Sequence, residues 1–245
     1  MYSHEGACSK CFMLFSDMRR HGGVRPDVTT LCSLLSVCAS SDHLALGSGI
    51  HSLCHRSGLN SSVLVGNALV NMYSAARRMN EAESLFWTMS RRDVISCNTM
   101  ISSYVQNGSC VEALQTLGLL LQTDEGPPNH MTFSSALGAC SSPEALMDGR
   151  TVHAMVLQCS LQNNLLIGNS LLTMYSKCNS MEDAERVFQS MPCCDVVSCN
   201  VLIGGYSTLE DATNAMRVFF LDEGYWDKAK LYHNNKSPGI LQNFT

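Results

Sequence analysis

The chain of 245 residues repeats itself at an offset of 102 residues. The segment LVGNALVNMYS at 64–74 returns as LIGNSLLTMYS at 166–176, and 13 of the 31 positions between 63–93 and 165–195 are identical without a gap. Self-similarity at a fixed spacing is typical of solenoids, in which no unit buries its apolar face alone and neighbours stack to form the core. The sequence therefore predicts an elongated array of repeats.

The period divides into three helical hairpins, at 63–93, 94–129 and 130–164, with lengths of 31, 36 and 35 residues. In the first hairpin, apolar residues share one face on either side of the polar break at 75–80, as two amphipathic helices require. The residues expected on these faces are Leu64, Leu69, Met72 and Tyr73, then Ala82, Leu85, Phe86 and Met89. Two short helices joined in this way form an αα-hairpin.

Turn-forming residues predict where helices end. Gly108 is expected to end the first helix of the second hairpin, and Pro127 with Pro128 stops its second helix from continuing. In the third hairpin a break is expected around 141–149, before a second helix at 150–160. β-Branched clusters are short, so strands are not expected.

The expected fold is all-α, a right-handed α-solenoid superhelix of tandem helix-turn-helix repeats. The hairpin pattern extends outward from the central triplet in both directions. The expected order is a partial N-terminal repeat at 1–27, full repeats at 28–62, 63–93, 94–129, 130–164 and 165–195, a truncated repeat at 196–220, and a divergent tail at 221–245.

Charge and cysteine content narrow the class of protein. The net charge of −5 argues against a purely electrostatic nucleic-acid binder, which is normally basic. No apolar run approaches the roughly 18 residues of a membrane helix, so no membrane partner is expected. Among the 13 cysteines, Cys38 and Cys140, like Cys97 and Cys199, recur one period apart beside apolar residues. They are expected to be buried, reduced thiols.

The motifs of common enzymes and cofactor sites are absent from the sequence. It contains no Walker loop, no GxSxG and no paired-carboxylate site, so neither a catalytic residue nor a small-molecule substrate is expected. His51 and His153 lie a full period apart and are interpreted as packing residues, because metal ligands must converge. The Cys8–Cys11 and Cys193–Cys194 pairs lack further ligands, so no metal or other cofactor is expected.

The repeat lengths and motifs resemble those of the plant pentatricopeptide repeat proteins. The motifs GNALVNMYS at 66–74 and VISCNTMISSYVQNG at 94–108, with the 36-, 35- and 31-residue alternation, resemble the PLS subclass in particular. On this resemblance 94–129 is a P-type repeat and 196–220 a truncated one. The L-type repeats are 28–62 and 130–164, and the S-type repeats are 63–93 and 165–195. No extension of the E or DYW type is recognisable, since the His-x-Glu and Pro-Cys-x-x-Cys of a zinc deaminase are missing.

The resemblance implies that each repeat binds one base of single-stranded RNA, selected by its fifth and last residues. The implied pairs are Asn67 with Asp93, Asn98 with Asn129, and Asn169 with Asp195, and Asn200 begins a further pair. Weaker pairs in the L-type repeats are Cys32 with Ser62 and Ser134 with Asn164. The second residues, which would wedge between neighbouring bases, are Leu64, Ile95, Leu166 and Val197. Lys177 stands where S-type repeats often contact the RNA backbone, whereas the equivalent Ala75 cannot.

The recurring asparagines also draw attention on physical grounds. Asn is a poor helix former, yet Asn67, Asn98, Asn169 and Asn200 each occur inside an expected first helix. An amide offers a donor and an acceptor and could meet a base edge. The alternative is a ladder of hydrogen bonds between repeats. Asp93 and Asp195 precede helical runs and are also expected to act as helix N-caps, which is compatible with base recognition.

Two functions are open at this point. The first is selective binding of organellar RNA in the mitochondrion or chloroplast, for RNA processing or recognition of C-to-U editing sites, without catalysis. The family code then implies U at 63–93 and 165–195, C or U at 94–129, little preference at 130–164, and a pyrimidine at 196–220. The second is a protein-interaction scaffold that binds RNA-editing cofactor proteins. The chain starts and stops within a repeat, without an Arg- and Ser-rich transit segment, so either a fragment or a truncated gene product of a longer array is expected.

Overall fold

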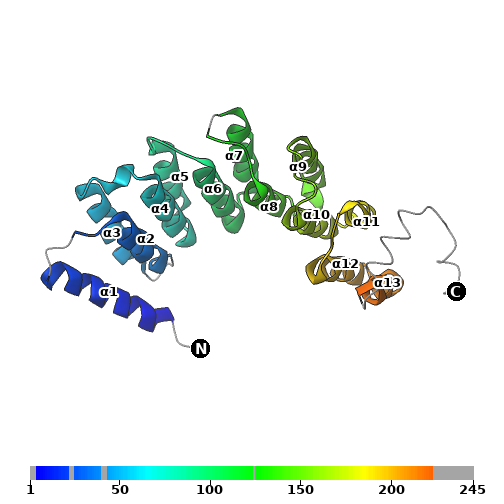
Figure 1. The fold of residues 1–245 in the computed structure, drawn as a ribbon, viewed down its shortest axis with the longest axis horizontal. Coiled ribbons are helices and arrows are strands. Elements are labelled where there is room, and N and C mark those ends of the chain that lie inside the picture. The colour runs from blue at the N-terminus through cyan, green and yellow to red at the C-terminus, as the bar shows by residue number, and fades with distance from the viewer. Residues whose placement is uncertain (1–3, 22–24, 40–42, 124, 223–245) are drawn as a thin grey trace. The chain divides into compact units, whose positions relative to one another are not determined.

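The computed structural model describes residues 4–21, 25–39, 43–123 and 125–222, and every regular element in these ranges is helical (Figure 1). The α-helices are α1 (His4–His21), α2 (Val28–Val37), α3 (Leu44–Arg56), α4 (Val63–Ala75), α5 (Met79–Thr88), α6 (Val94–Asn107), α7 (Cys110–Gln122), α8 (His130–Ala139), α9 (Leu146–Gln158), α10 (Leu165–Lys177), α11 (Met181–Ser190), α12 (Val196–Thr208) and α13 (Ala212–Asp222). The predicted all-α fold is confirmed. None of the described helices is long and apolar enough to cross a membrane.

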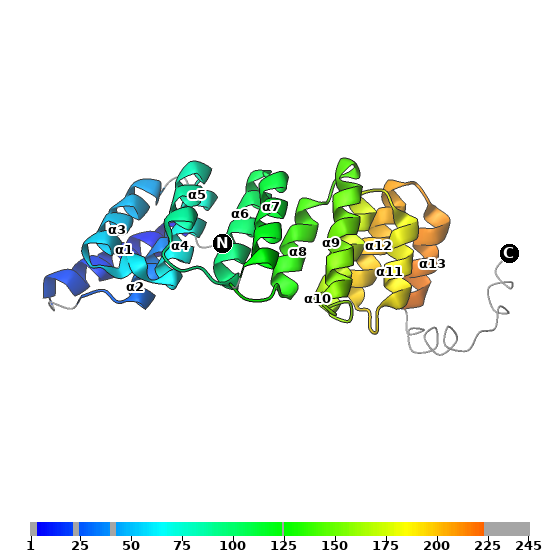
Figure 2. The same ribbon diagram turned by 90° about the horizontal axis from the view of Figure 1, so that it is seen from above.

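The chain divides into two compact units, Met1–Ala139 and Cys140–Thr245. In the first unit α2, α4, α6 and α8 pack in succession, and α3, α5 and α7 lie against them (Figure 2). In the second unit α10 packs on α12, and α9, α11 and α13 lie against these two. We call α2, α4, α6, α8, α10 and α12 the first helices, and α3, α5, α7, α9, α11 and α13 the second helices. Each unit is thus a two-layer stack of helices.

The apolar faces predicted for 63–93 form the core, with one exception. Leu69, Met72 and Phe86 have almost no exposed surface. Leu64, expected on the same face, is instead exposed to solvent, because it lies in the first turn of α4, beyond the reach of α5. The two predicted helices therefore pack as a hairpin, and Leu64 is left outside its core.

Gly108 ends α6 as predicted, with a left-handed φ of 81° that residues with a Cβ rarely adopt. The break predicted around 141–149 is present but shorter, since α8 ends at Ala139, α9 already begins at Leu146, and Gly149 lies inside α9. Gly149 is a packing residue, because a Cβ there would overlap the Sδ of Met174. One period earlier, a Cβ at Gly47 would lie 2.7 Å from the Sδ of Met72. The glycine permits close helix packing and does not interrupt the helix.

The cysteines that recur at the 102-residue offset are buried, as predicted. Cys38, Cys97, Cys140 and Cys199 have between 0% and 1% of their surface exposed. Within the described residues, no three His, Cys, Asp or Glu side chains lie close enough together to hold a metal ion. The side chain of Cys8 and the tail beyond residue 222 lie outside the described residues.

The two histidines of the repeat pack against tyrosines. His51 Nδ1 lies 3.0 Å from the Tyr73 hydroxyl, and His153 Nδ1 lies 2.9 Å from the Tyr175 hydroxyl. In both pairs the rings meet edge to face with centroids 5.7 Å apart. This confirms their predicted packing role. Burial lowers the pKa of both histidines, and for His153 the carboxylate of Asp183 partly opposes the shift.

Lowering the pH from 7.5 to 5.5 is expected to destabilise the fold. Both histidines have a pKa below the ordinary value near 6.5, so the unfolded chain binds more protons than the folded chain in this range. The free energy of unfolding therefore decreases as the pH is lowered. Melting temperatures at the two pH values measure the effect. The double variant His51→Gln, His153→Gln should show a smaller difference between them. Equal differences in both proteins would contradict this origin.

Candidate nucleic-acid interface

An apolar side chain at the second position of a repeat projects from the start of several first helices. Leu64, Ile95, Leu166 and Val197 are between 53% and 59% exposed. Sequence reasoning missed a fifth member, Met131, which is the second residue of the 130–164 repeat and 54% exposed. Its position in the repeat was a sufficient signal. These five side chains, which we call the apolar row, are unpartnered surface and not core.

Asn169 forms a closed network with the start of the next repeat. Its Nδ2 donates to Asp195 Oδ1 at 3.1 Å, and its Oδ1 accepts from the Ser198 hydroxyl at 2.6 Å. Asp195 also caps α12, accepting from the Ser198 backbone N–H at 2.9 Å, while its own N–H donates to the Ser198 hydroxyl at 3.1 Å. This capping box confirms the predicted N-cap. The hydrogen bond from the Ser198 backbone is the largest cause of the lowered pKa of Asp195.

Asn98 forms the equivalent network with different residue types. Its Nδ2 donates to Asn129 Oδ1 at 3.3 Å, and its Oδ1 accepts from the Thr132 hydroxyl at 2.6 Å. Asn129 Oδ1 also accepts from the backbone N–H groups of Met131 and Thr132, at 3.0 and 3.2 Å. Two of the predicted pairs are therefore brought together. In each network one bond, from the Thr132 or the Ser198 hydroxyl, joins neighbouring repeats, as the alternative of an inter-repeat ladder predicts, and base recognition by the same amides stays a prediction.

Asn67 differs from its two counterparts. It is 9% exposed, and neither its Nδ2 nor its Oδ1 has a hydrogen-bond partner among the described residues. Asp93 and Ser96 nevertheless form the same capping box as the later copy, with the Ser96 N–H 2.8 Å from Asp93 Oδ1. Asn67 and Asp93 thus occupy the fifth and last positions of their repeat, but no hydrogen bond joins the two side chains.

A polar cluster ties the segment that carries Asn129 to the preceding turn. Arg92 Nε donates to Glu125 Oε1 at 2.9 Å, and the Cys97 thiol donates to Glu125 Oε2 at 2.9 Å. Burial raises the pKa of the Cys97 thiol to about 12, and the hydrogen bond to the Glu125 carboxylate contributes to the same shift. The thiol therefore stays protonated. The Arg92 guanidinium lies over the Phe86 and Trp87 rings, 5.2 and 5.4 Å from their centroids. These contacts therefore hold in place the segment that leads from α7 to Asn129, the partner of Asn98.

The remaining predicted residues are less organised. Asn200 is exposed on α12. Cys32 and Ser134 are half-buried, and Ser62 precedes α4 without a side-chain cap bond. Asn164 caps α10, accepting from the N–H groups of Leu166 and Ile167 at 3.0 and 3.2 Å. Sequence reasoning missed this role, although Asn directly before an apolar run is an N-cap signal.

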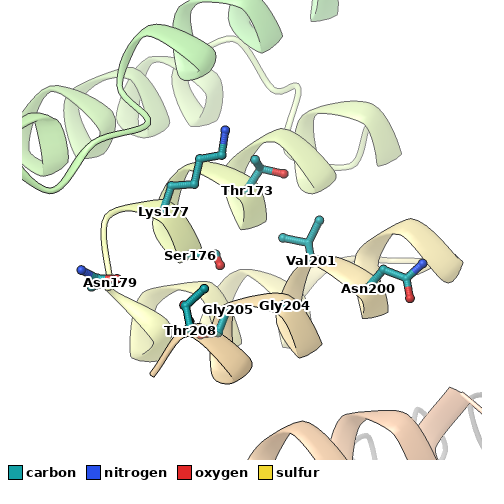
Figure 3. A pocket seen from close by; sticks show the side chains of 9 residues that line it. All are labelled: Thr173, Ser176, Lys177, Asn179, Asn200, Val201, Gly204, Gly205 and Thr208. Carbon is teal, nitrogen blue, oxygen red and sulfur yellow. Dashed lines mark hydrogen bonds between the residues drawn. The ribbon is translucent and has the colours of Figure 1, made fainter. Parts of the chain in front are cut away.

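A hollow of about 510 Å³ lies between α10 and α12 (Figure 3). It is lined by Thr173, Ser176, Lys177, Asn179, Asn200, Val201, Gly204, Gly205 and Thr208. Lys177 and Thr173 extend from α10, while Asn200 and Val201 belong to α12, where a Cβ added at Gly204 would meet nothing within 4 Å. The missing side chain at Gly204 thus contributes to the open space beside the exposed Lys177.

Charge is distributed unevenly between the two layers of helices. None of the six first helices contains an Asp or a Glu, and Lys177 is the one Lys or Arg in these described helices. The acidic residues on the second helices include Glu81, Glu83, Glu112, Asp148, Glu182, Asp183 and Glu185. In each unit the helices that carry the apolar row and the asparagines therefore contain no carboxylate, and the acidic Asp93 and Asp195 lie at the N-caps of α6 and α12.

Sequence comparison connects these features with known proteins. The family model of the PPR repeat matches residues 1–23, 67–94, 95–122 and 169–196. A mitochondrial pentatricopeptide repeat-containing protein of Arabidopsis thaliana is 39% identical over 216 residues, which are 86% of this chain and 20% of that protein. The chloroplastic pentatricopeptide repeat-containing protein CRR2 of Arabidopsis thaliana is 35% identical over 202 residues, or 80% of this chain and 31% of that protein.

Structure comparison gives the same result. The crystal structure of the pentatricopeptide repeat protein PPR10 in complex with an 18-nucleotide psaJ RNA element matches with a TM-score of 0.68 at 21% identity, over 89% of this chain and 33% of that one. The structure of PPR10 from maize matches with a TM-score of 0.66. The chain spans between a fifth and a third of the length of these relatives. With its stacked helical hairpins and these relatives, the chain is a pentatricopeptide repeat protein similar to those of plants.

Proposed function

We propose that the chain binds single-stranded RNA along its first helices. The observation that carries this proposal is the apolar row, which places an exposed apolar side chain at the second position of five repeats, beside amides held by hydrogen bonds. Stacking of bases on side chains, with a polar contact to one base edge per repeat, is how helical repeats recognise RNA. The lack of carboxylates within the first helices limits repulsion of phosphates there to the capping Asp93 and Asp195.

The base contacts are assigned to the fifth and last residues of each repeat. In Asn98 and Asn169 the observed bonds use one of two N–H groups and one acceptor site of the amide oxygen, so a donor and an acceptor remain for a base. The assignment is U for 63–93 and 165–195, C or U for 94–129, and a pyrimidine for 196–220. The L-type repeats at 28–62 and 130–164 contribute little selectivity.

The biological setting follows from the relatives. Their names place one in the mitochondrion and another in the chloroplast, which supports an organellar protein. The PLS subclass is proposed from the alternation of 36-, 35- and 31-residue repeats in the sequence. Recognition of sites for RNA processing or C-to-U editing, without catalysis by the described residues, is the role proposed for this array. The chain spans a third or less of the length of these relatives. The role in processing or editing is therefore proposed for the protein as a whole.

Selection from a random RNA pool is expected to enrich pyrimidines in register with the repeats. The chain and the RNA should run parallel, with the strongest preference, for U, opposite the 165–195 repeat, where the hydrogen-bond network is complete. Sequencing the bound fraction measures the preference at each position. The same selection with Asn169→Thr serves as the comparison, and unchanged enrichment at that position would contradict the assignment. Recovery of RNA without pyrimidine bias would contradict it as well.

A protein-interaction scaffold is the second candidate function. Exposed apolar side chains also occur on the second helices, at Trp87, Val111 and Met147, where the proposed RNA contacts would not reach. Such a surface is suited to a protein partner, for instance an RNA-editing cofactor protein. Salt dependence separates the two functions, since each phosphate contact contributes about −0.7 to the slope of log K against log salt for a single strand. An apolar protein interface should show almost no slope.

A further inference from the structure

We propose that a buried hydroxyl at the third position of one repeat orients the base-reading amide of the repeat before it. The positioning residues are Ser198 for Asn169 and Thr132 for Asn98. This inference rests on the proposed RNA-binding function and adds a third element to each reading pair. We call each set of fifth residue, last residue and following hydroxyl an amide triad.

The chemistry of the triad at Asn169 permits one orientation of the amide. The Asp195 carboxylate can only accept, so the amide must turn its Nδ2 toward it. The oxygen of the amide then faces the hydroxyl of Ser198, which donates to it at 2.6 Å. Ser198 has no exposed surface, so water cannot replace this donor. The result is an amide that presents its remaining donor and acceptor in a fixed order.

The triad at Asn98 reaches the same orientation by a different route. Asn129 Oδ1 accepts from two backbone N–H groups at the start of α8, so the Asn129 oxygen, and not its nitrogen, faces Asn98. Asn98 must again turn its Nδ2 toward this oxygen, and the fully buried Thr132 hydroxyl donates to its Oδ1 at 2.6 Å. Two repeats with different last residues and different hydroxyls thus share one arrangement.

The first copy of the repeat shows what happens without the third element. Ser96 is buried at the equivalent position and its hydroxyl lies 2.9 Å from Asp93 Oδ1, as that of Ser198 lies 3.0 Å from Asp195 Oδ1, but the Ser96 hydroxyl does not contact the Asn67 amide. Both polar atoms of that amide are buried without partners among the described residues. The pair of Asn67 with Asp93 therefore has the residues of a U-reading repeat without their orientation.

Orientation matters because a half-turn of an amide exchanges its donor and its acceptor. Uracil and cytosine differ in this pattern along their Watson–Crick edge, where cytosine carries an amino group and uracil a carbonyl. An amide that can turn freely accommodates both bases, whereas an amide fixed beside a carboxylate, as Asn169 is, favours one. Beside Asn98 the amide nitrogen of Asn129 adds a donor of its own, so C or U remains the assignment there. Base discrimination is therefore expected to be greater at the 165–195 repeat than at the 63–93 repeat, although both carry the Asn and Asp pair.

The experiment compares three variants of the full chain. Ser198→Ala removes the donor to Asn169, Ser198→Thr keeps a hydroxyl in the geometry that Thr132 already adopts, and Ser96→Ala removes the same capping bonds without touching an amide. Each is titrated with two RNAs that differ only in U or C opposite the 165–195 repeat, and with two that differ opposite the 63–93 repeat. The readout is the ratio of the two Kd values at each position.

Ser198→Ala is expected to lower the U-over-C ratio opposite 165–195 by about tenfold, the scale of one buried hydrogen bond to an unsatisfied partner. Ser198→Thr should restore it, and Ser96→Ala should change the ratio at 63–93 less than twofold, despite a similar loss of helix capping. An unchanged ratio in Ser198→Ala, or an equal loss in Ser96→Ala, overturns the positioning role while RNA binding stands. If the unaltered chain binds none of the RNAs, the proposed function fails and this inference fails with it.

Discussion

Replacing Phe86 by alanine is expected to lower the free energy of unfolding by about 3–5 kcal/mol, the usual range for emptying a buried aromatic site. Phe86 has no exposed surface and fills the interior of the α4–α5 hairpin. Because a domain is stable by only about 5–15 kcal/mol in total, the loss should be visible as a large shift of the denaturation midpoint. Circular dichroism at increasing urea concentration measures it.

The neighbouring Trp87 offers a matched control for this variant. It is 52% exposed on the same helix, and its ring meets Phe86 edge to face with centroids 5.1 Å apart. Trp87→Ala removes a larger side chain but far less buried surface, so its cost should be less than half that of Phe86→Ala. Similar costs for the two variants would show that side-chain size matters here more than burial, contrary to the packing described.

Leu166→Glu is expected to weaken RNA binding by about 10- to 100-fold, since burying a Leu side chain between bases contributes about 1.5–3 kcal/mol and the new carboxylate repels phosphate. Leu166 belongs to the apolar row and is 55% exposed, so the change should leave the melting temperature nearly unaltered. Fluorescence anisotropy with a labelled pyrimidine-rich RNA gives the affinity.

Leu157→Glu is the control for the charge and exposure of this change. Leu157 lies on the second helix α9 and is 51% exposed, so the two variants replace equally exposed leucines by the same residue. Its RNA affinity should stay within about twofold of the unaltered chain, because screening reduces the effect of a distant surface charge. An equal loss in both variants would indicate a general electrostatic effect and would count against the apolar row as the contact surface.

Much of the fold could be predicted because it depends on local periodicity. Leu69, Met72 and Phe86 are buried as their spacing indicated, and Gly108 ends α6 as its lack of a Cβ indicated. The break around 141–149 was predicted too long, because Gly can also serve a close contact between helices. Only the position of Met174, on the next first helix, shows which role Gly149 has.

The sequence predicted which residues form the candidate site, but not how those residues are hydrogen-bonded. Position within the repeat indicated Asn67 and Asn169 equally, and the two lie in segments with the same Asp and Ser at the following cap. Their hydrogen bonding nevertheless differs, since Asn169 contacts Asp195 and Ser198 whereas the Asn67 amide has no partner among the described residues, and the residues at the fifth position and the cap do not distinguish the two. Ser198 and Thr132 were missed for a related reason, since a hydroxyl near a helix start is ordinarily assigned to capping alone.

The contacts of Gly47 with Met72 and of Gly149 with Met174 make the hairpins sensitive to oxidation. Both methionines have no exposed surface, so an oxidant reaches their sulfur atoms only when the helices separate. A sulfoxide adds a polar oxygen to a thioether that already lies against a glycine of the preceding repeat, so neighbouring hairpins cannot pack together in the same way. A brief opening of the array thereby becomes permanent damage unless the sulfoxide is reduced.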